Sequence, residues 1–337
     1  MTIKLCAAFI IGFAAALITG LVFVPFLRRV KAGQSIREDG PSWHKTKAGT
    51  PTMGGVIFIV GCAAACVGVG YSAFADGDFG HLFVLAFALA FGAIGFVDDY
   101  YKLKKKQNLG LTAGKKFILQ VAAATVFVFA LRQFGFISPA LYIPFANITV
   151  QLPEALYFIF AVFAIVATVN AVNLTDGLDG LATGTTIPVF IFFSVVAFTW
   201  GESFMARGIF SSGLAGALLA FLSFNFYPAK VFMGDTGSLF LGGAVAGMAF
   251  AMDMPLIIVT VGIIYIAEVL SDVIQVLYFK ITHGKRFFKM APFHHHLEMG
   301  GWSGKKRTEK QIFTMFTAIS ILMAVISYFG VFNRYGI

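Results

Sequence analysis

Charged residues are scarce in this chain of 337 residues, in which Asp, Glu, Lys and Arg together make up only 12%. Soluble globular domains carry about 25% charged residues, and disordered chains lack the apolar content needed to form a core, so both classes are excluded. Three cysteines are too few for a disulfide scaffold, and ten prolines are too few for a collagen-like chain.

Apolar residues dominate instead. They make up 58% of the chain and include 40 Phe, beside 36 Gly. Bulky residues suit contact with acyl chains, and small residues let helices approach closely. A membrane-spanning helix takes roughly 20 apolar residues, so about ten spans would account for most of this content.

We therefore predict an all-α, polytopic membrane protein with ten transmembrane helices. It forms a single domain over residues 1–337, because no linker, low-complexity tract or clear repeat divides the chain. The predicted spans lie near residues 5–27, 52–74, 80–97, 117–136, 154–171, 185–200, 209–224, 238–252, 255–279 and 311–332.

The net charge of +9 is unevenly distributed. Of the 25 Lys and Arg, all but four lie in loops that follow odd-numbered spans, the exceptions being Lys4, Arg132, Arg207 and Arg334. Since Lys and Arg accumulate in cytoplasmic loops, we predict that these loops are cytoplasmic and that both termini lie outside. Most of these cations need no role beyond fixing topology and touching anionic lipid.

Two adjacent carboxylates, Asp98 and Asp99, end the third predicted span. Such a pair repels itself and is costly near hydrocarbon unless a cation is close. The pair therefore favours divalent-metal or proton chemistry at the membrane face. The alternative is a polar helix end that only marks the water boundary.

The segment 170–184, NAVNLTDGLDGLATG, contains no Lys or Arg. Asn173, Asp176 and Asp179 recur every three residues, so a helical turn would put them on one face. Glycines such as Gly177 permit close approach of the backbone. The segment suits hydrogen bonding to a polar ligand, and an acidic turn between two spans is the alternative.

The segment 225–243, NFYPAKVFMGDTGSLFLGG, places Asn225, Phe232 and Asp235 just before the eighth span. The helix that Gly234 and Ser238 open should present N–H groups that favour a phosphate. It is not a Walker loop, since no Gly-Lys-Ser/Thr follows. A carboxylate beside an anion-binding helix start fits a magnesium–phosphate site, and an N-capping Asp is the alternative.

Three consecutive histidines, His294, His295 and His296, lie between the last two spans. In an extended segment the first and third would point one way and the second the other. No Cys or further His lies at zinc-like spacing. We therefore favour phosphate contact and orientation over a soft-metal site, with a solvated His run as the alternative.

The ninth run carries a polar stripe at helical spacing. Acids inside a membrane mark a functional cavity by default, and structural pairing inside the bundle is the alternative. The stripe consists of Glu268, Ser271, Asp272 and Gln275.

Together, four motifs resemble the phospho-N-acetylmuramoyl-pentapeptide transferase family, within the polyprenyl-phosphate N-acetylhexosamine-1-phosphate transferase superfamily. The resemblance covers the whole chain. The Asp pair and GDTGS are shared across the superfamily, whereas WHKTKAGTPTMGG and PFHHHLE favour this branch. The motifs are DDY (98–100), NAVNLTDGLDGLATG (170–184), NFxPAxVFMGDTGS (225–238) and PFHHHLE (292–298).

The resemblance implies transfer of phospho-MurNAc-pentapeptide from UDP-MurNAc-pentapeptide to undecaprenyl phosphate, with formation of lipid I and release of UMP. It further implies a Mg²⁺ requirement, an active site on the cytoplasmic face, a place in the bacterial cytoplasmic membrane and a homodimer. No nucleic-acid partner is expected.

The resemblance also implies roles for individual residues. Asp235 would ligate Mg²⁺, while Asp98 and Asp99 would position or deprotonate the lipid phosphate or help to bind the cation. A phospho-enzyme on one Asp stays an open alternative. His294 and His295 would contact phosphates.

The remaining implied roles concern the substrate. Asn173, Asp176 and Asp179 would hold the uridine side. Phe232 would stack on the base and Asn225 would hydrogen-bond to it. Further expected substrate contacts are His296 in support, Lys47, Thr52, Lys106, Lys115 and Gln275.

Two other functions are alternatives. The first is a sister transferase that uses UDP-GlcNAc with the same lipid phosphate, against which PFHHHLE argues. The second is a secondary transporter, which would carry acids near the bilayer centre and often an inverted repeat. Here the acids gather at the cytoplasmic ends of spans.

Overall fold

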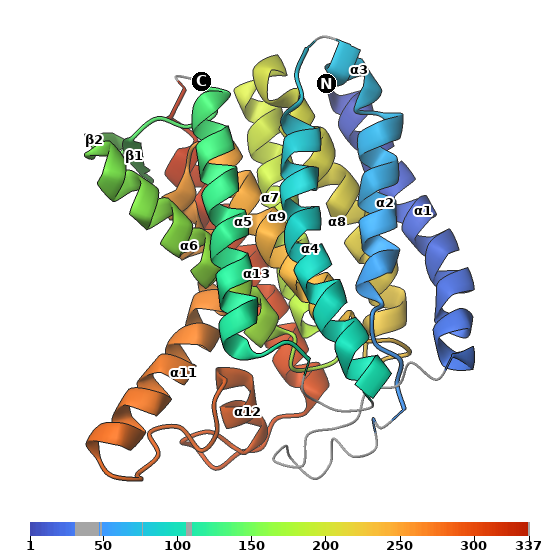
Figure 1. Ribbon diagram of the computed structural model, residues 1–337, viewed down its shortest axis with the longest axis vertical. Coiled ribbons are helices and arrows are strands. Elements are labelled where there is room, and N and C mark those ends of the chain that lie inside the picture. Colours follow the sequence, from blue (N-terminus) through green and yellow to red (C-terminus); the bar gives the residue numbers. More distant parts are fainter. Residues whose placement is uncertain (31–46, 48, 76, 106–109, 336–337) are drawn as a thin grey trace.

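The computed structural model describes residues 1–30, 47, 49–75, 77–105 and 110–335. It is mainly helical, and the long helices pack side by side in one bundle (Figure 1). Its elements are α1 (Thr2–Arg29), α2 (Gly55–Gly68), α3 (Tyr71–Ala75), α4 (Gly80–Lys105), α5 (Ala113–Gln133), β1 (Ala140–Ile143), β2 (Ile148–Gln151), α6 (Glu154–Thr175), α7 (Leu181–Trp200), η2 (Glu202–Phe204), α8 (Met205–Asn225), α9 (Gly234–Ala251), η3 (Pro255–Ile257), α10 (Ile258–Val261), α11 (Ile263–Ile281), α12 (Phe293–Glu298) and α13 (Glu309–Val331).

The prediction of a helical, multi-pass membrane protein is confirmed. Seven described helices are long and apolar enough to cross a membrane, and a bent pair of helices provides an eighth candidate. Each of the ten predicted runs overlaps a helix, but not all of these helices meet the length and hydropathy of a span. At 14 residues α2 is short, and α9 opens on Gly-Asp-Thr-Gly-Ser, which lowers its mean hydropathy.

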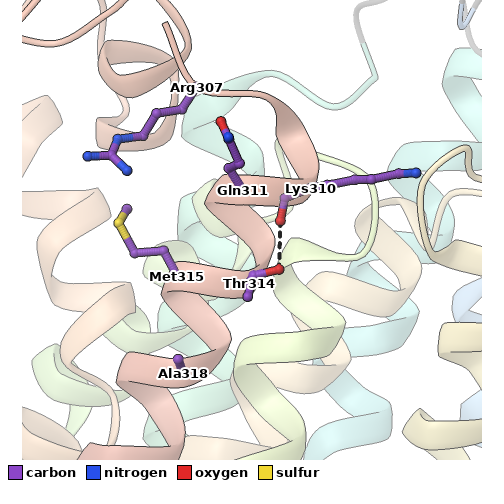
Figure 2. A pocket seen from close by; sticks show the side chains of 6 residues that line it. All are labelled: Arg307, Lys310, Gln311, Thr314, Met315 and Ala318. Carbon is purple, nitrogen blue, oxygen red and sulfur yellow. Dashed lines mark hydrogen bonds between the residues drawn. The ribbon is translucent and has the colours of Figure 1, made fainter. Parts of the chain in front are cut away.

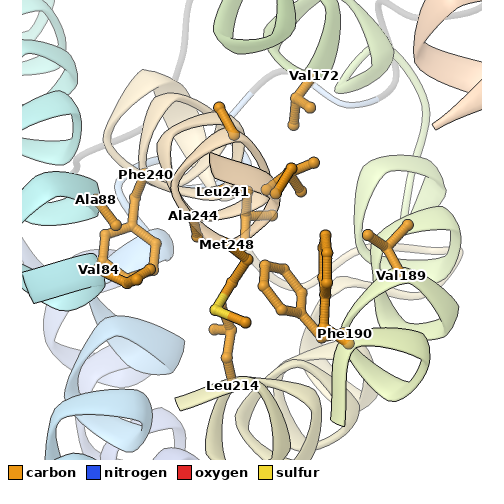
Figure 3. Packing of buried hydrophobic residues seen from close by; sticks show 14 of the residues in the cluster. Val84, Ala88, Val172, Val189, Phe190, Leu214, Phe240, Leu241, Ala244 and Met248 are labelled. Carbon is orange, nitrogen blue, oxygen red and sulfur yellow. The ribbon is translucent and has the colours of Figure 1, made fainter. Parts of the chain in front are cut away.

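The helix α9 lies at the centre of the bundle, with every residue from Thr236 to Ala251 buried. Figure 3 shows Phe240 of α9 against Ala88 of α4, and Met248 close to Leu214 of α8. A Cβ atom on Gly95 of α4 would lie 2.0 Å from the carbonyl oxygen of Asp235. The backbones of α4 and α9 therefore touch directly, next to the predicted carboxylates.

The ninth predicted span is a broken helix and not one continuous helix. The segments Pro255–Val261 and α11 meet at 85°, with the break at Gly262. Beyond the break α11 leaves the bundle at an angle (Figure 1). It buries the polar side chains of Glu268 and Ser271 and exposes apolar ones such as Leu277. Because acids and hydroxyls are costly against lipid, Glu268 and Ser271 face protein, whereas Asp272 and Gln275 of the same stripe are partly exposed.

The all-α prediction misses a small antiparallel hairpin formed by β1 and β2, in which Ala140 pairs with Gln151. The strands carry β-branched and aromatic residues, which favour extended backbone over helix. Figure 1 shows the hairpin and both chain ends at one end of the bundle, with α12 at the other. The site described next lies at the end near α12.

Candidate active site

Three carboxylates meet where the last turns of α4 touch the start of α9. One oxygen from each of Asp98, Asp99 and Asp235 lies within 4.8 Å of the others, close enough to share a metal ion. The Asp98 and Asp99 side chains are buried, whereas Asp235 is partly exposed. Carboxylate oxygens are the ligands that Mg²⁺ prefers. The structure thus brings together the two Asp motifs that the sequence singled out.

The Asp99 carboxylate caps α9. Its Oδ1 accepts the N–H of Asp235 at 3.2 Å, and its Oδ2 accepts the N–H and the hydroxyl of Thr236 at 2.9 and 2.7 Å. A carboxylate is stabilised at a helix N-terminus. The prediction that this helix start binds a phosphate is therefore wrong for these two amides, because Asp99 already takes them. Through the same bonds Asp99 fixes the position of Asp235.

Two lysines neutralise part of this charge. Lys102 Nζ lies 2.7 Å from Asp98 Oδ2 and 2.8 Å from Asp235 Oδ2, and Lys116 Nζ lies 3.0 Å from the same Asp235 oxygen. Three carboxylates thus face two ammonium groups, which leaves one negative charge in excess if all are ionised. A divalent cation fits such a set of oxygens.

The sequence singled out other lysines. Lys106 lies outside the described residues, and Lys115 is exposed, its backbone N–H donating to the Thr112 cap of α5. Spacing could have indicated Lys102, since it lies four residues after Asp98 and thus on the same helix face. No comparable signal separates Lys116 from Lys115, because only the docking of α5 decides which of the two faces Asp235.

Asn173, at the end of α6, is tied to the carboxylate cluster. Its Nδ2 donates to Asp235 Oδ1 at 2.9 Å and to Ser238 Oγ at 2.7 Å. Asp176 follows directly after α6. Burial, and then the nearby charges of Asp235 and Asp99, raise the pKa of Asp176 to about 8. Its side chain is therefore largely protonated at neutral pH.

A second ion-pair cluster joins segments that are far apart in the sequence. Lys47 Nζ lies 2.6 Å from Asp179 Oδ1 and 2.6 Å from Glu309 Oε2. Asp179 Oδ2 accepts the N–H of Ala229 at 2.9 Å. Burial alone would lower the pKa of Lys47, but the charges of Glu309 and Asp179 raise it. Glu309 was not singled out from the sequence, since an acid in a first helical turn is ordinary.

Asn225, expected to hydrogen-bond the base, already has two partners. It is buried, its Nδ2 donates to the carbonyl of Val231 at 3.0 Å, and its Oδ1 accepts the hydroxyl of Thr183 at 2.8 Å. These bonds hold the end of α8 against α7 and the loop that leads to α9. The amide retains one N–H and one lone pair, but the side chain is buried, so contact with a base would require it to become accessible.

Phe232 is half-buried, and its main chain pairs with the segment before α2. Its N–H donates to the carbonyl of Pro51, and its carbonyl accepts the N–H of Gly54, both at 2.8 Å. Thr52 lies between them and is buried, with its Oγ1 next to Gly234. The structure thus places Thr52 beside the Asp99–Asp235 pair.

The His run forms the short helix α12 and is not extended, so the alternation of an extended segment does not apply to it. His294 is buried, and its Nδ1 lies 3.0 Å from Glu268 Oε2 on α11. Its Nε2 faces Gly177, where a Cβ atom would lie only 2.2 Å away. Glycine at 177 therefore makes room for the imidazole, and His294 links α11 to the loop after α6.

The other two histidines have different surroundings. His295 Nδ1 lies 2.7 Å from Glu298 Oε2, and the ring is partly exposed. His296 is buried against Phe288 and Trp302, and its Nδ1 accepts the N–H of Lys289 at 3.1 Å. Burial, and then the charge of Lys289, lower the pKa of His296. It therefore packs as a neutral ring.

Gln275 fastens the loop after α11. Its Oε1 accepts the N–H groups of Phe287 and Phe288, and its Nε2 donates to the Phe288 carbonyl at 3.3 Å. All three bonds go to the backbone, so the amide is engaged on both sides. Substrate binding by Gln275 stays a prediction.

A hollow of about 440 Å³ lies on α13 (Figure 2) and contains none of the predicted site residues. Arg307 and Lys310 line it, but Figure 2 shows their side chains pointing away from each other. Two cations that diverge do not converge on one anion. The carboxylate cluster, with the loop after α6 and α12, is the better candidate for the active site.

Comparison with known proteins agrees with this choice. A family model described as glycosyl transferase family 4 matches residues 81–253, which include the three carboxylates. A phospho-N-acetylmuramoyl-pentapeptide-transferase signature matches residues 47–59.

Nearly the whole chain is similar to proteins named phospho-N-acetylmuramoyl-pentapeptide-transferase. It is 45% identical to one from Clostridium botulinum, over 96% of this chain and 95% of the relative. The identity is 44% to one from Clostridium acetobutylicum, over 95% and 96% of the two chains. It is 43% to one from Shouchella clausii, over 96% of each.

Proposed function

This chain belongs to the phospho-N-acetylmuramoyl-pentapeptide-transferase family, and from that premise we propose a function for its site. The protein transfers phospho-MurNAc-pentapeptide from UDP-MurNAc-pentapeptide to undecaprenyl phosphate, forming lipid I and releasing UMP. The observation that carries the assignment is the cluster of Asp98, Asp99 and Asp235 at the end of the membrane helices. A soluble nucleotide and a lipid phosphate can meet at such a boundary.

The donor set of the cluster fits Mg²⁺. Its ligand atoms are oxygens, they lie within 4.8 Å of one another, and the charges of two lysines do not cancel those of the three carboxylates. Asp98 and Asp235 would hold the ion, and Asp99 would fix the position of Asp235 through the hydrogen bond from the Asp235 N–H. The bound ion would neutralise charge on the diphosphate, which phosphoryl transfer requires.

The residues around the cluster serve positioning and charge. Lys102 and Lys116 place positive charge beside Asp235, where diphosphate oxygens must come. Nε2 of His294 faces the loop after α6 and offers a further phosphate contact. The lipid phosphate is already largely ionised at neutral pH, so Asp98 serves to position it more than to deprotonate it.

The nucleoside side of the substrate lies along the loop after α6, with Asp176, Asp179 and Lys47. Asn173 belongs instead to the metal side, because both of its donated bonds run toward α9. The exposed apolar face of α11 suits the prenyl chain, since its side chains point away from the bundle core. Lys115, Phe232, Asn225 and Gln275 are weaker candidates for direct contact.

The proposed function also implies a membrane topology. The ten spans include α2, α9 and the bent pair, and both termini lie outside, in the bacterial cytoplasmic membrane. The placement of both chain ends opposite α12 supports the termini sharing one side (Figure 1). The basic loops support a cytoplasmic site. A homodimer rests on the family alone.

The deciding experiment is UMP release by the purified protein. Release should require both undecaprenyl phosphate and Mg²⁺, and Asp235→Asn, folded and inserted, should abolish it. Offering UDP-GlcNAc in parallel tests the sister reaction, which we expect to be negligible. Near-normal transfer by Asp235→Asn would refute the metal role, and a labelled phospho-enzyme formed without the lipid would favour the two-step route.

A further inference from the structure

Glu309 has a place that its position in the sequence does not explain. It is the first residue of α13, where an acid commonly faces solvent and interacts with the helix dipole. Here the side chain is only 10% exposed and turns inward to Lys47. The helix start has its own cap, since Thr308 and Gln311 form a reciprocal capping box. Glu309 is therefore not needed to satisfy the end of α13.

The inward side chain completes the surroundings of Lys47. Asp179 offers Lys47 only one oxygen, at 2.6 Å, because its other oxygen accepts the N–H of Ala229. Glu309 Oε2 provides the second acceptor at 2.6 Å and also accepts the N–H of Asp179 at 3.3 Å. A single acceptor leaves an ammonium free to swing, whereas two acceptors fix it.

The fixed ammonium has a consequence for ligand binding. An ammonium carries three N–H bonds, and two of them are directed at Asp179 and Glu309. Among the described residues no further acceptor is recorded for the third. The charge of Glu309, with that of Asp179, also raises the pKa of Lys47 against the effect of burial. Lys47 thus stays protonated, and its third N–H bond keeps a fixed direction in which it can donate to a ligand.

We propose that Glu309 is a positioning residue for the donor nucleotide, which acts by fixing Lys47 and by tying α13 to the loop after α6. This inference rests on the proposed function, in which Lys47 and Asp179 lie on the nucleotide side. It adds α13 to the elements that build that side.

The test uses UMP as the probe and the full chain in detergent. Glu309→Gln keeps the shape but loses the charge. Glu309→Asp keeps the charge at the helix start but falls short of Lys47. Loss of one charge-assisted contact should weaken UMP binding about tenfold in both variants. KM for UDP-MurNAc-pentapeptide should rise similarly, while kcat and KM for undecaprenyl phosphate stay within about twofold. Glu154→Gln, at the far end of the bundle, is the control.

A double-mutant cycle separates positioning from a general structural effect. If Glu309 acts through Lys47, adding Glu309→Gln to Lys47→Met should weaken UMP binding further by less than about twofold. Additive losses, full UMP affinity in Glu309→Gln, or full recovery in Glu309→Asp would overturn the proposal. A melting curve checks folding, and Glu309→Asp carries the test if Glu309→Gln does not fold.

The two proposals fail separately. A wild-type chain that binds UMP but transfers no phosphosugar refutes the proposed function. A wild-type chain that transfers normally, while Glu309→Gln keeps full UMP affinity, refutes the positioning role alone.

Discussion

Replacing Asp99 by Asn should destabilise the fold as well as impair transfer, because Asp99 caps α9. The carboxylate accepts three hydrogen bonds, two from Thr236 and one from the amide of Asp235. An Asn side chain has one acceptor oxygen. If that oxygen keeps the two shorter bonds from Thr236, the new NH₂ group points at the amide of Asp235, which is itself a donor.

The magnitude follows from that mismatch. A buried donor left without an acceptor costs about 1–3 kcal/mol, and loss of a charge at a helix N-terminus costs about 0.3–1 kcal/mol. Relief of repulsion among three neighbouring carboxylates offsets part of this. Asp98→Asn gains the same relief and can still accept the N–H of Leu111. It loses its ion pair with Lys102, but Lys102 keeps Asp235 as a partner, so no group is left without one. The difference in unfolding free energy between the two variants should therefore be about 1 kcal/mol, with Asp99→Asn the less stable.

The assay is equilibrium unfolding in mixed micelles without added Mg²⁺, followed by circular dichroism, with UMP release measured in parallel. Thr236→Val serves as a milder comparison because it removes only the hydroxyl donor. If Asp99→Asn proves as stable as Asp98→Asn but inactive, the capping role is refuted and Asp99 acts directly on substrate or metal.

Three further outcomes are expected. Asn173→Ala should raise the Mg²⁺ concentration needed for half-maximal transfer by about tenfold, because the Asn173 amide holds Asp235. An unchanged Mg²⁺ concentration would favour the sequence-based prediction that Asn173 binds the uridine. Lys116→Met should lower kcat by about tenfold or more, while Lys115→Met stays near wild type; equal effects would contradict the docking of α5. At neutral pH Asp176→Asn should keep UMP affinity in Mg²⁺-free buffer and Asp176→Ala should not, because burial raises the pKa of Asp176 to about 8. Above about pH 8 the wild-type carboxyl ionises whereas the amide of the Asp176→Asn variant stays neutral, so the UMP affinity of the wild type should fall below that of the variant. If the UMP affinities of the two proteins change in parallel with pH, Asp176 is not protonated at neutral pH.

The main architecture could be predicted because lipid imposes strong rules on sequence. Apolar runs overlap the described helices throughout, and nearly all Lys and Arg fall in the loops after odd-numbered predicted spans. The bend at Gly262 escaped prediction because apolar content alone does not distinguish a straight span from a broken one. The stripe of Glu268 and Ser271 was the available signal, since it required protein on one side of α11.

The residue types of the site were predictable, but their partners were not. The Asp98–Asp99 pair and Asp235 were identified from the sequence as site residues, and they share one cluster. That Asp99 would cap α9 depends on how α4 meets α9, which no local pattern encodes. The same holds for Lys116, whose role follows from packing between helices.

The contact at Gly95 has a consequence for how the site can change over time. Because main chain meets main chain at Gly95, no side chain lies between α4 and α9 at that point to absorb adjustments. The backbone paths of α4 and α9 therefore determine the distance from Asp98 and Asp99 to Asp235. Lipid-facing and core side chains can drift without altering it. A single methyl group at Gly95, however, would push the two backbones apart and shift Asp235 relative to Asp98 and Asp99.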